Sequence, residues 1–229
     1  MLIVEELHML LLRPDGRVES SVSVNRLYGE IAAVLTDLAL RGRIRITDDR
    51  HPVVEIASTE PTGHPVLDET LERLVPLRGK RLQSLVARPK LDPLDVVVES
   101  LVVQGVLVRG ERGFFGWGSA RTPESDPAPE LILRARLAEV LAGARTPTRT
   151  DLSLLSILQH LGAAHALLRE ECAGVSASEL KTRIGELVAG STEAPGAAAG
   201  AAVATAIDLA MAAAMMAAMT PAVVVATSV

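Results

Sequence analysis

The segment YGEIAAVLTDLALRGRIRI, residues 28–46, contains the clearest structural pattern in the chain. Its first part carries apolar side chains at Ile31, Leu35 and Leu38, a spacing that places them on one face of a helix. Gly42 follows the last apolar residues, at the position where a glycine commonly ends a helix. After it, arginine alternates with isoleucine, which predicts a short strand with one basic and one apolar face. An amphipathic helix followed directly by a strand is therefore predicted.

The same patterns extend along the chain and predict a mainly helical protein with short hairpins. Ser176 and Glu179 have the spacing of a capping box at the start of one of these helices. No composition shift or internal repeat divides the chain, so one domain is expected over residues 1–229. Further helices are predicted over residues 4–12, 67–74, 94–104, 130–141, 151–169 and 178–188, a turn over 13–17, a surface loop over 119–129, and strands over 41–46, 51–57, 106–108 and 114–117.

Composition sets limits on the class of protein. The 229 residues include 48% hydrophobic side chains, enough for a sizeable core, and 28 acidic against 23 basic residues. The resulting net charge of −5 argues against a protein that coats nucleic acid generally. Cys172 is the only cysteine, so no internal disulfide can form, and we expect a cytoplasmic protein with this thiol buried as a small apolar group.

The C-terminal tract is the one long segment with almost no charge. From Ala197 to Val229 the only ionisable side chain is that of Asp208. A membrane span is disfavoured, because the tract is mostly alanine and one central aspartate costs about 2.5 to 3.5 kcal/mol on insertion. Apolar residues instead recur at every fourth position from Val203 to Met219, which predicts a helix packed inside the domain. At the other end, no signal peptide is expected, because acidic residues follow the short apolar start.

Motifs for catalysis or metal binding are not found in the sequence. It contains no Gly-x-Ser-x-Gly, P-loop, His-Glu-x-x-His or Gly-x-Gly-x-x-Gly pattern. His160 and His165 would lie about 140° apart around one predicted helix, which does not form a metal site. The adjacent carboxylates Glu5 and Glu6 are interpreted as solvated surface. We therefore expect no enzyme activity, no metal and no cofactor.

Aromatic residues are concentrated at one place in the chain. Phe114, Phe115 and Trp117 are three of the four aromatic residues in the sequence, and they lie on a predicted strand of a hairpin. Together with Arg109 and Arg112 they could contact a membrane interface, where aromatic rings insert and each arginine gains about 1 kcal/mol against anionic lipid. The alternative, in which the rings pack on a helical core or on an oligomer partner, stays open.

A winged helix-turn-helix is a second alternative for residues 94–117, because a helix is followed there by a two-stranded wing. The exposed face of that helix would carry Asp92, Asp95 and Glu99, which repel phosphates. DNA binding is therefore a minor alternative.

Four short motifs occur in an order and spacing that resemble one known family. They are EELHMLLL with DG (residues 5–16), LTDLALRGRI (35–44), PTG with LDE (61–69) and LVVQGVL (101–107). The sequence resembles the Golgi phosphoprotein 3 family over nearly its whole length. Arginine supplies 20 of the 23 basic residues, which is typical of a GC-rich bacterial genome, so a bacterial member is expected.

The resemblance implies a fold and a function. The implied fold class is all-α, a single helical-bundle domain with small β-hairpins. The implied function is that of a peripheral membrane adaptor, which in eukaryotic members recognises phosphatidylinositol 4-phosphate on the Golgi and retains glycosyltransferases there. We therefore expect an adaptor-like protein that binds an anionic or phosphoinositide membrane lipid on the cytoplasmic membrane face. A protein partner and a homo-oligomer are further expectations; the alternatives are a cytosolic oligomeric scaffold and a winged-helix DNA binder.

The family's headgroup site does not carry over to this sequence. Its lipid-binding tryptophan and arginines correspond by ungapped alignment to Val22, Ile31, Leu91 and Leu94, none of which can bind phosphate. The headgroup ligands are therefore unknown, and specificity for the 4-phosphate is doubtful. The basic residues nearby in the sequence that could substitute are Arg26, Arg81, Arg88 and Lys90.

Overall fold

The structure is a computed structural model that describes residues 1–13, 15–19, 23, 25–47, 50–110, 121–172 and 174–192. Three predictions fall outside these ranges: the hairpin residues Arg112, Phe114, Phe115 and Trp117, the helix from Val203 to Met219, and the position of Val22.

Within the described ranges the chain is mainly helical, with one small two-stranded sheet, which confirms the predicted fold class. The α-helices are α1 (Ile3–Leu11), α2 (Arg26–Leu40), α3 (Pro65–Leu74), α4 (Leu82–Val86), α5 (Leu94–Val103), α6 (Ala128–Leu141), α7 (Arg149–His160), α8 (Ala164–Leu167) and α9 (Ala177–Thr192). Two short 3₁₀ helices, η1 (Val75–Leu77) and η2 (Pro89–Leu91), and the strands β1 (Ile44–Ile46) and β2 (Val54–Ile56) complete the set.

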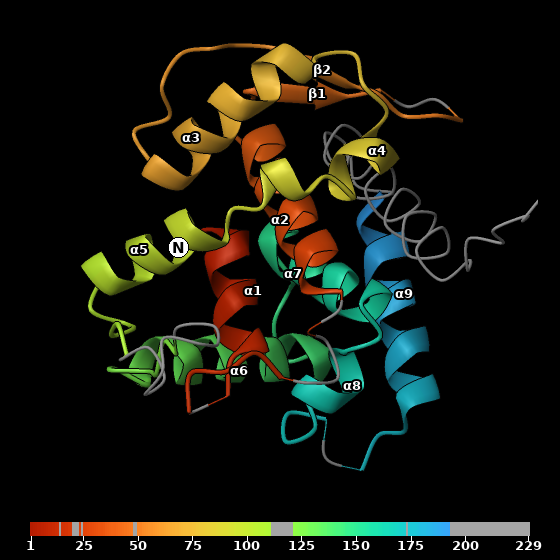
Figure 1. Ribbon diagram of the computed structural model, residues 1–229. Helices are drawn as coiled ribbons and strands as arrows, with labels where there is room; N and C mark the ends of the chain where they lie inside the picture. The colour runs from red at the N-terminus through yellow and green to blue at the C-terminus, as the bar shows by residue number, and fades with distance from the viewer. Residues whose placement is uncertain are drawn as a thin grey trace, which may run out of the picture.

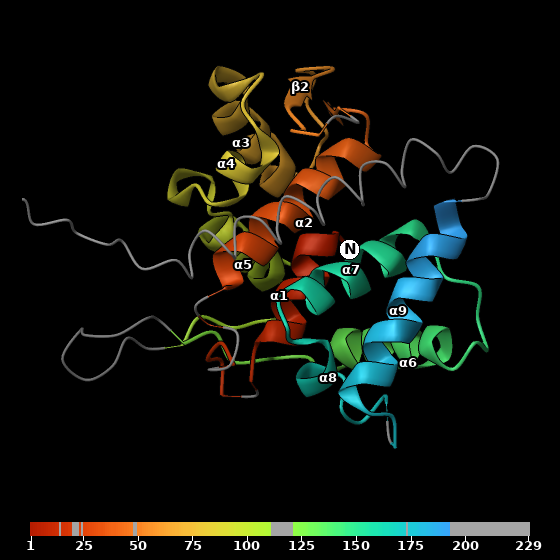
Figure 2. The ribbon, with the colours of Figure 1, turned by 90° about the vertical axis from the view of Figure 1, so that its right-hand side faces the viewer.

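The centre of the fold is formed by α1, α2 and α7, which contact one another (Figure 1). The strands and α3 lie at one end of the molecule, and α6 and α8 lie at the other (Figures 1 and 2). Every residue of α1 is buried, including its charged ones. The two carboxylate oxygens of Asp37 on α2 accept hydrogen bonds from the amides of Ile3 and Val4, each at 3.1 Å. These bonds satisfy the start of α1, where helix amides have no internal partner.

The opening pattern of the sequence is confirmed in detail. α2 covers the predicted helix, and Gly42 follows it with φ of 66°, a conformation that glycine adopts readily. β1 then pairs with β2 in antiparallel register, with Ile44 opposite Ile56 and Ile46 opposite Val54. Both isoleucines of β1 are buried, while Arg45 between them is exposed.

Two predictions about the second half of the chain are wrong in their boundaries. The helix predicted over 151–169 is divided into α7 and α8, because the backbone turns at Gly162 with φ of 68°. The segment 106–108 pairs with residues that lie further along the chain than the predicted partner strand, 114–117. Leu107 forms a β-bridge with Glu124, and the amide of Val108 donates to the carbonyl of Pro123. Part of the segment predicted as a loop over 119–129 is therefore the partner of this strand-like segment.

Candidate functional site: a pocket between α3 and α5

A pocket of about 650 Å³ lies where the end of α3 and η1 meet η2 and the start of α5. Its volume lies within the range of about 300–1,000 Å³ that is typical of small-molecule sites. The wall combines apolar and charged side chains from segments that are distant in the sequence. The lining residues are Arg73, Pro76, Leu77, Arg88, Pro89, Lys90, Leu91, Asp92, Leu94 and Asp95.

Positive charge at this pocket comes from α3 and η2. Arg73 is partly neutralised, because it forms an ion pair with Glu69 and donates to the carbonyl of Asp92 at 3.1 Å. Arg88 and Lys90 form no ion pair with any residue in the described part of the chain, and Lys90 is exposed. At η2 the pocket thus presents two cations that are not ion-paired with any carboxylate of the described residues.

The acidic side of the pocket is held by a chain of charged side chains, of which Arg26 and Asp92 are partly buried. Asp92 receives two hydrogen bonds from the guanidinium of Arg26, at 3.1 and 2.7 Å. Arg26 also pairs with Glu30 on its own helix, and the second oxygen of Glu30 contacts Nδ1 of His8 at 2.7 Å. Glu30 and His8 are almost completely buried. Side chains of α1 and α2 are therefore linked to Asp92, which lines the pocket between η2 and α5.

These contacts fix the ionisation of Asp92. Burial by itself would raise the pKa of Asp92, but the hydrogen bonds and charge of Arg26 outweigh it and hold this pKa below its ordinary value. Burial would likewise lower the pKa of Arg26, whereas its bonds to Asp92 and Glu30 raise it above the ordinary value. Both groups stay charged at neutral pH, so Asp92 remains bound to Arg26 and is not free to repel an anion at full strength.

A second polar cluster holds α5 against α1. One oxygen of the buried Glu5 accepts hydrogen bonds from Ser100 at 2.6 Å and from Gln104 at 2.8 Å. Its other oxygen accepts the amide of Leu2 at 2.8 Å. The predicted solvent exposure of Glu5 is therefore wrong, because partners almost a hundred positions away in the sequence satisfy its carboxylate.

Glu6 is buried as well, and the prediction of a solvated surface is wrong for it too. Arg136 on α6 donates to both of its oxygens, at 3.1 and 2.7 Å. The same guanidinium lies 2.8 Å from Asp151 at the start of α7, so one arginine balances two buried carboxylates from different helices. Burial would lower the pKa of Arg136, but its bonds to Glu6 and the charge of Asp151 raise it.

Of the basic residues considered as replacement headgroup ligands, two line the pocket and two do not. Arg88 and Lys90 line it. Arg26 is bound to Glu30 and Asp92, and Arg81 is exposed at a bridge with Val53.

Of the positions that correspond to the family's headgroup ligands, two line the pocket and one lies in the core. Leu91 and Leu94 form part of the pocket wall, whereas Ile31 is fully buried in α2. The sequence does not mark Arg73 as a site residue, because its helical spacing from Glu69 indicates an ordinary surface ion pair.

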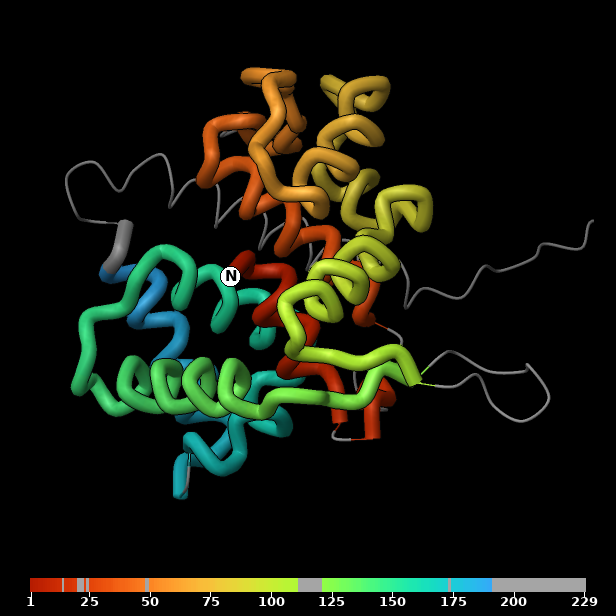
Figure 3. Tube along the Cα trace, turned by 90° about the vertical axis from the view of Figure 1, so that its left-hand side faces the viewer, coloured from red at the N-terminus to blue at the C-terminus, as the bar shows by residue number. Residues whose placement is uncertain are grey.

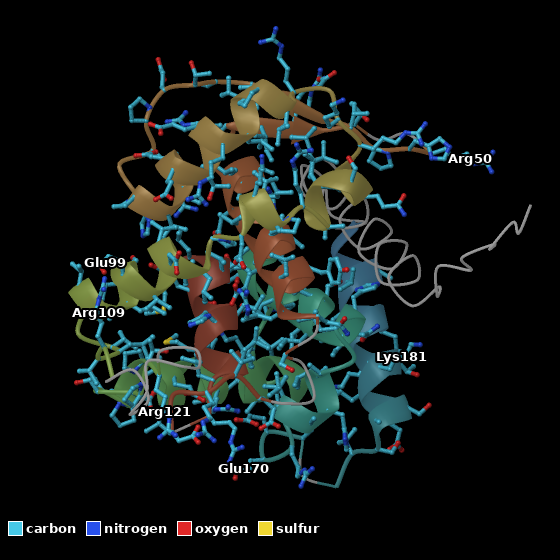
Figure 4. All side chains as sticks on the ribbon, in the orientation of Figure 1. Arg50, Glu99, Arg109, Arg121, Glu170 and Lys181 are labelled. Carbon is cyan, nitrogen blue, oxygen red and sulfur yellow. The ribbon has the colours of Figure 1, made fainter. Side chains whose placement is uncertain are left out.

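The base of the aromatic hairpin lies within the described residues. Arg109 forms an ion pair with Glu99 of α5, and the two side chains lie together at the left of Figure 4. The amide of Gly110 donates to the carbonyl of Arg121 at 2.9 Å, which joins the two residues that flank positions 111–120. Asp95 and Glu99 are both exposed on α5, so this helix presents an acidic face that disfavours contact with DNA phosphates.

His160 and His165, which are not expected to form a metal site, each contact a backbone carbonyl. Nδ1 of His160 lies 2.9 Å from the carbonyl of Ser156, and Nε2 of His165 lies 3.1 Å from that of Val175. Across the described residues, no group of three or more His, Cys, Asp or Glu side chains is placed to hold a metal ion. Cys172 is buried in the hydrophobic core, as predicted, and burial raises the pKa of its thiol.

None of the helices in the described ranges combines the length and the apolar character that crossing a membrane requires. No curated protein matches the sequence. The family model described as Golgi phosphoprotein 3 (GPP34) matches residues 3–210, from the first residue of α1 to beyond α9. Because this match covers most of the chain and the fold is mainly helical with a small hairpin, the protein belongs to the Golgi phosphoprotein 3 family.

Proposed function

We propose that this protein is a peripheral membrane adaptor that binds anionic lipid headgroups at the pocket between α3 and α5. The observation that carries the proposal is a pair of cations at η2, Arg88 directly before it and Lys90 within it. Both line a pocket of about 650 Å³ and have no ion-pair partner among the described residues. Each basic residue near an anionic membrane surface contributes about 1 kcal/mol to binding. The protein acts through this contact and through a protein partner, and it does not catalyse a reaction.

The residues of the pocket are suited to attracting negative charge and less suited to recognising the position of one phosphate group. Leu91 and Leu94 form apolar wall where the family has arginines, and Asp95 adds a negative charge. Bidentate hydrogen bonding of a guanidinium to a phosphate therefore depends on Arg88, while Lys90 acts as a point charge. Weak discrimination between phosphatidylinositol 4-phosphate and other anionic lipids of equal charge is expected.

The arrangement of the chain supports a single membrane-facing side. The segment around α4 and η2 and the segment that follows α5 toward the hairpin both lie at the left of Figure 2 and at the right of Figure 3. A flat membrane could thus reach the pocket and the base of the hairpin together. Val108, which is 44% exposed, and the exposed Arg121 lie at that base and add one apolar and one basic contact.

Flotation with liposomes tests the proposal directly. The wild type should float with anionic vesicles and stay behind with neutral ones. The double variant Arg88→Gln, Lys90→Gln should bind about 30-fold more weakly, since two contributions of about 1 kcal/mol are removed. The matched control is Lys181→Gln with Arg183→Gln, which removes the same charge from exposed positions of α9.

The outcomes separate the possibilities. Equal losses in the two double variants would mean that net charge alone drives adsorption and that the pocket is not the site. Flotation that persists at about 1 M salt, where the Debye length falls to about 3 Å, and only with the 4-phosphate lipid, would show a specific headgroup site and refute the expected weak discrimination.

A further inference from the structure

α6 has an apolar face toward solvent as well as one toward the core. Leu133, Leu137 and Val140 are buried, as expected for a helix that covers a core. On the opposite side, Leu131 is 62% exposed and Ile132 is 68% exposed. Two neighbouring large aliphatic side chains are therefore left in water on a helix that already has a core-facing side, which is typical of a surface that binds a partner.

The outward face continues along the whole helix. Ala128, Ala135 and Ala142 are exposed and follow at intervals of seven residues, so they lie on the same side of the helix as the two large side chains. The basic residues of α6 lie on its flanks: Arg134 and Arg136 are both ion-paired with carboxylates of the same chain. We call the set Ala128, Leu131, Ile132, Ala135 and Ala142 the outer face of α6.

One charged residue interrupts this face. Glu139 is exposed and lies 3.7 Å from Arg145, just beyond the end of the helix. Both side chains are about half exposed, so the pair is weak and free to rearrange.

We propose that the outer face of α6 is a dimer interface, in which α6 packs antiparallel against α6 of a second copy and the two helices cross near Ala135. Small side chains at 128, 135 and 142 allow the two backbones to approach at the short end of the usual interaxial range of about 8–10 Å. Leu131 and Ile132 then fill the space on either side of the crossing.

Charge at the two ends of the face specifies the direction. The exposed Asp126 precedes α6, where one of its oxygens accepts the amide of Ala128 at 3.0 Å, and Arg145, in its weak pair with Glu139, follows the helix. An antiparallel crossing at residue 135 places each Asp126 close to Arg145 of the other copy, and it also opposes the two helix dipoles. A parallel arrangement would place like charges together at both ends, which is unfavourable.

The same charges favour a protein over a lipid surface as the occupant. A helix that lies on an anionic membrane typically carries lysine or arginine along the border of its apolar face. Here the charges bordering or interrupting the outer face include two carboxylates, those of Asp126 and Glu139, which an anionic membrane would repel. The interface is also distinct from the proposed membrane-facing side, because α6 begins beside the hairpin base and runs away from it (Figure 3).

The expected dimer is weak. α6 has 14 residues and is about 21 Å long, so its outer face alone is smaller than a standard protein interface of about 800 Å² per partner. We expect dissociation in the micromolar range or above, visible as a concentration-dependent mass in sedimentation equilibrium without any lipid present.

Engineered cysteines at the three exposed alanines test both the interface and its direction. Ala135→Cys lies at the proposed crossing and should form a disulfide-linked dimer under mild oxidation. Ala142→Cys should not link to itself, because two copies of residue 142 would be about 21 Å apart and a disulfide needs Cα atoms within about 7 Å. A mixture of Ala128→Cys and Ala142→Cys proteins should link as a mixed pair. The native Cys172 is buried and is common to all samples.

Each result bears on the proposal. Efficient self-linking of the Ala142→Cys protein would show parallel or random contact and overturn the antiparallel pair. Failure of the Ala135→Cys protein to link, with a mass that stays monomeric up to hundreds of micromolar, would overturn the interface itself. Two further variants act in opposite directions: Ala135→Glu should abolish the concentration dependence, and Glu139→Ala should strengthen it by removing the charge from the face. Circular dichroism of each variant confirms that the helices are retained.

Discussion

Gly16 connects the turn after α1 to the base of the hairpin, and replacing it tests how tightly these segments pack. Its φ is 76°, and its carbonyl accepts a hydrogen bond from the amide of Thr122 at 3.2 Å. A Cβ atom added at Gly16 would lie 2.3 Å from the backbone nitrogen of Pro123 and 2.5 Å from the carbonyl carbon of Thr122. Both neighbours are backbone atoms, so no side chain can rotate away to make room.

The expected cost of Gly16→Ala is the sum of three effects. The left-handed conformation costs alanine about 1 kcal/mol. Restoring a normal contact of about 3.5 Å moves the two segments apart by about 1 Å, which breaks the bond to Thr122 and costs about 1 kcal/mol. Looser packing around the separated segments adds about 1 kcal/mol. The total is about 3 kcal/mol, or a fall in melting temperature of about 6–12 °C for a chain of this size.

Gly42→Ala is the matched control. Gly42 has a similar φ of 66°, but an added Cβ would meet nothing within 4 Å. Only the backbone cost of about 1 kcal/mol remains, so the melting temperature should fall by about 2–4 °C. Urea and thermal unfolding of the wild type and the two variants measure the difference. Equal destabilisation by both substitutions would refute close packing of the turn against the hairpin base.

Three further perturbations follow from the buried charges and the hairpin. Arg136→Met leaves the carboxylates of Glu6 and Asp151 buried without their cation, so unfolding in urea should show a loss of about 3–5 kcal/mol; a change below 1 kcal/mol would mean that water reaches them. Burial raises the pKa of Asp37 from 3.8 to about 6. The folded state therefore holds this proton more tightly than the unfolded chain does, and this stabilises the fold below pH 4. As pH rises through 6 the stabilisation is lost, so the free energy of unfolding falls by about 3 kcal/mol. Asp37→Asn should therefore become more stable relative to the wild type between pH 4 and pH 7, and a constant difference across this range would contradict the raised pKa. Trp117 is the only tryptophan, and we expect its emission to shift to the blue on adding anionic vesicles; a spectrum that does not respond would argue against hairpin insertion.

Local patterns in the sequence were sufficient for much of the fold. The apolar spacing in residues 28–40 and the glycine at 42 predict α2 and its end, because each depends only on neighbours within about one helical turn. The capping box is confirmed as well: the hydroxyl of Ser176 donates to Glu179 at 2.6 Å and accepts the amide of Glu179 at 3.3 Å. The order of short motifs is sufficient to indicate the family, which the match of the family model confirms.

Where a local pattern is ambiguous, packing decided the result. Residues 151–169 contain enough helix-forming side chains to predict one continuous helix, yet the chain turns at Gly162. On one side of this turn α7 packs against α1, α2 and α9, and on the other side α8 contacts α7 and α9. A glycine within a helical pattern is tolerated in isolation, so the local pattern does not decide whether the helix continues or breaks there.

The candidate site was determined by tertiary structure. Its cations come from α3 and η2, and its acidic wall depends on Arg26 and Asp92, which are 66 positions apart in the sequence. The same holds for Glu5 and Glu6, whose adjacent carboxylates are typical of a solvated surface until α5 and α6 supply buried partners. Helix formation depends on residues three or four positions apart, whereas the burial of a charge depends on which distant segment folds over it and supplies a counter-charge.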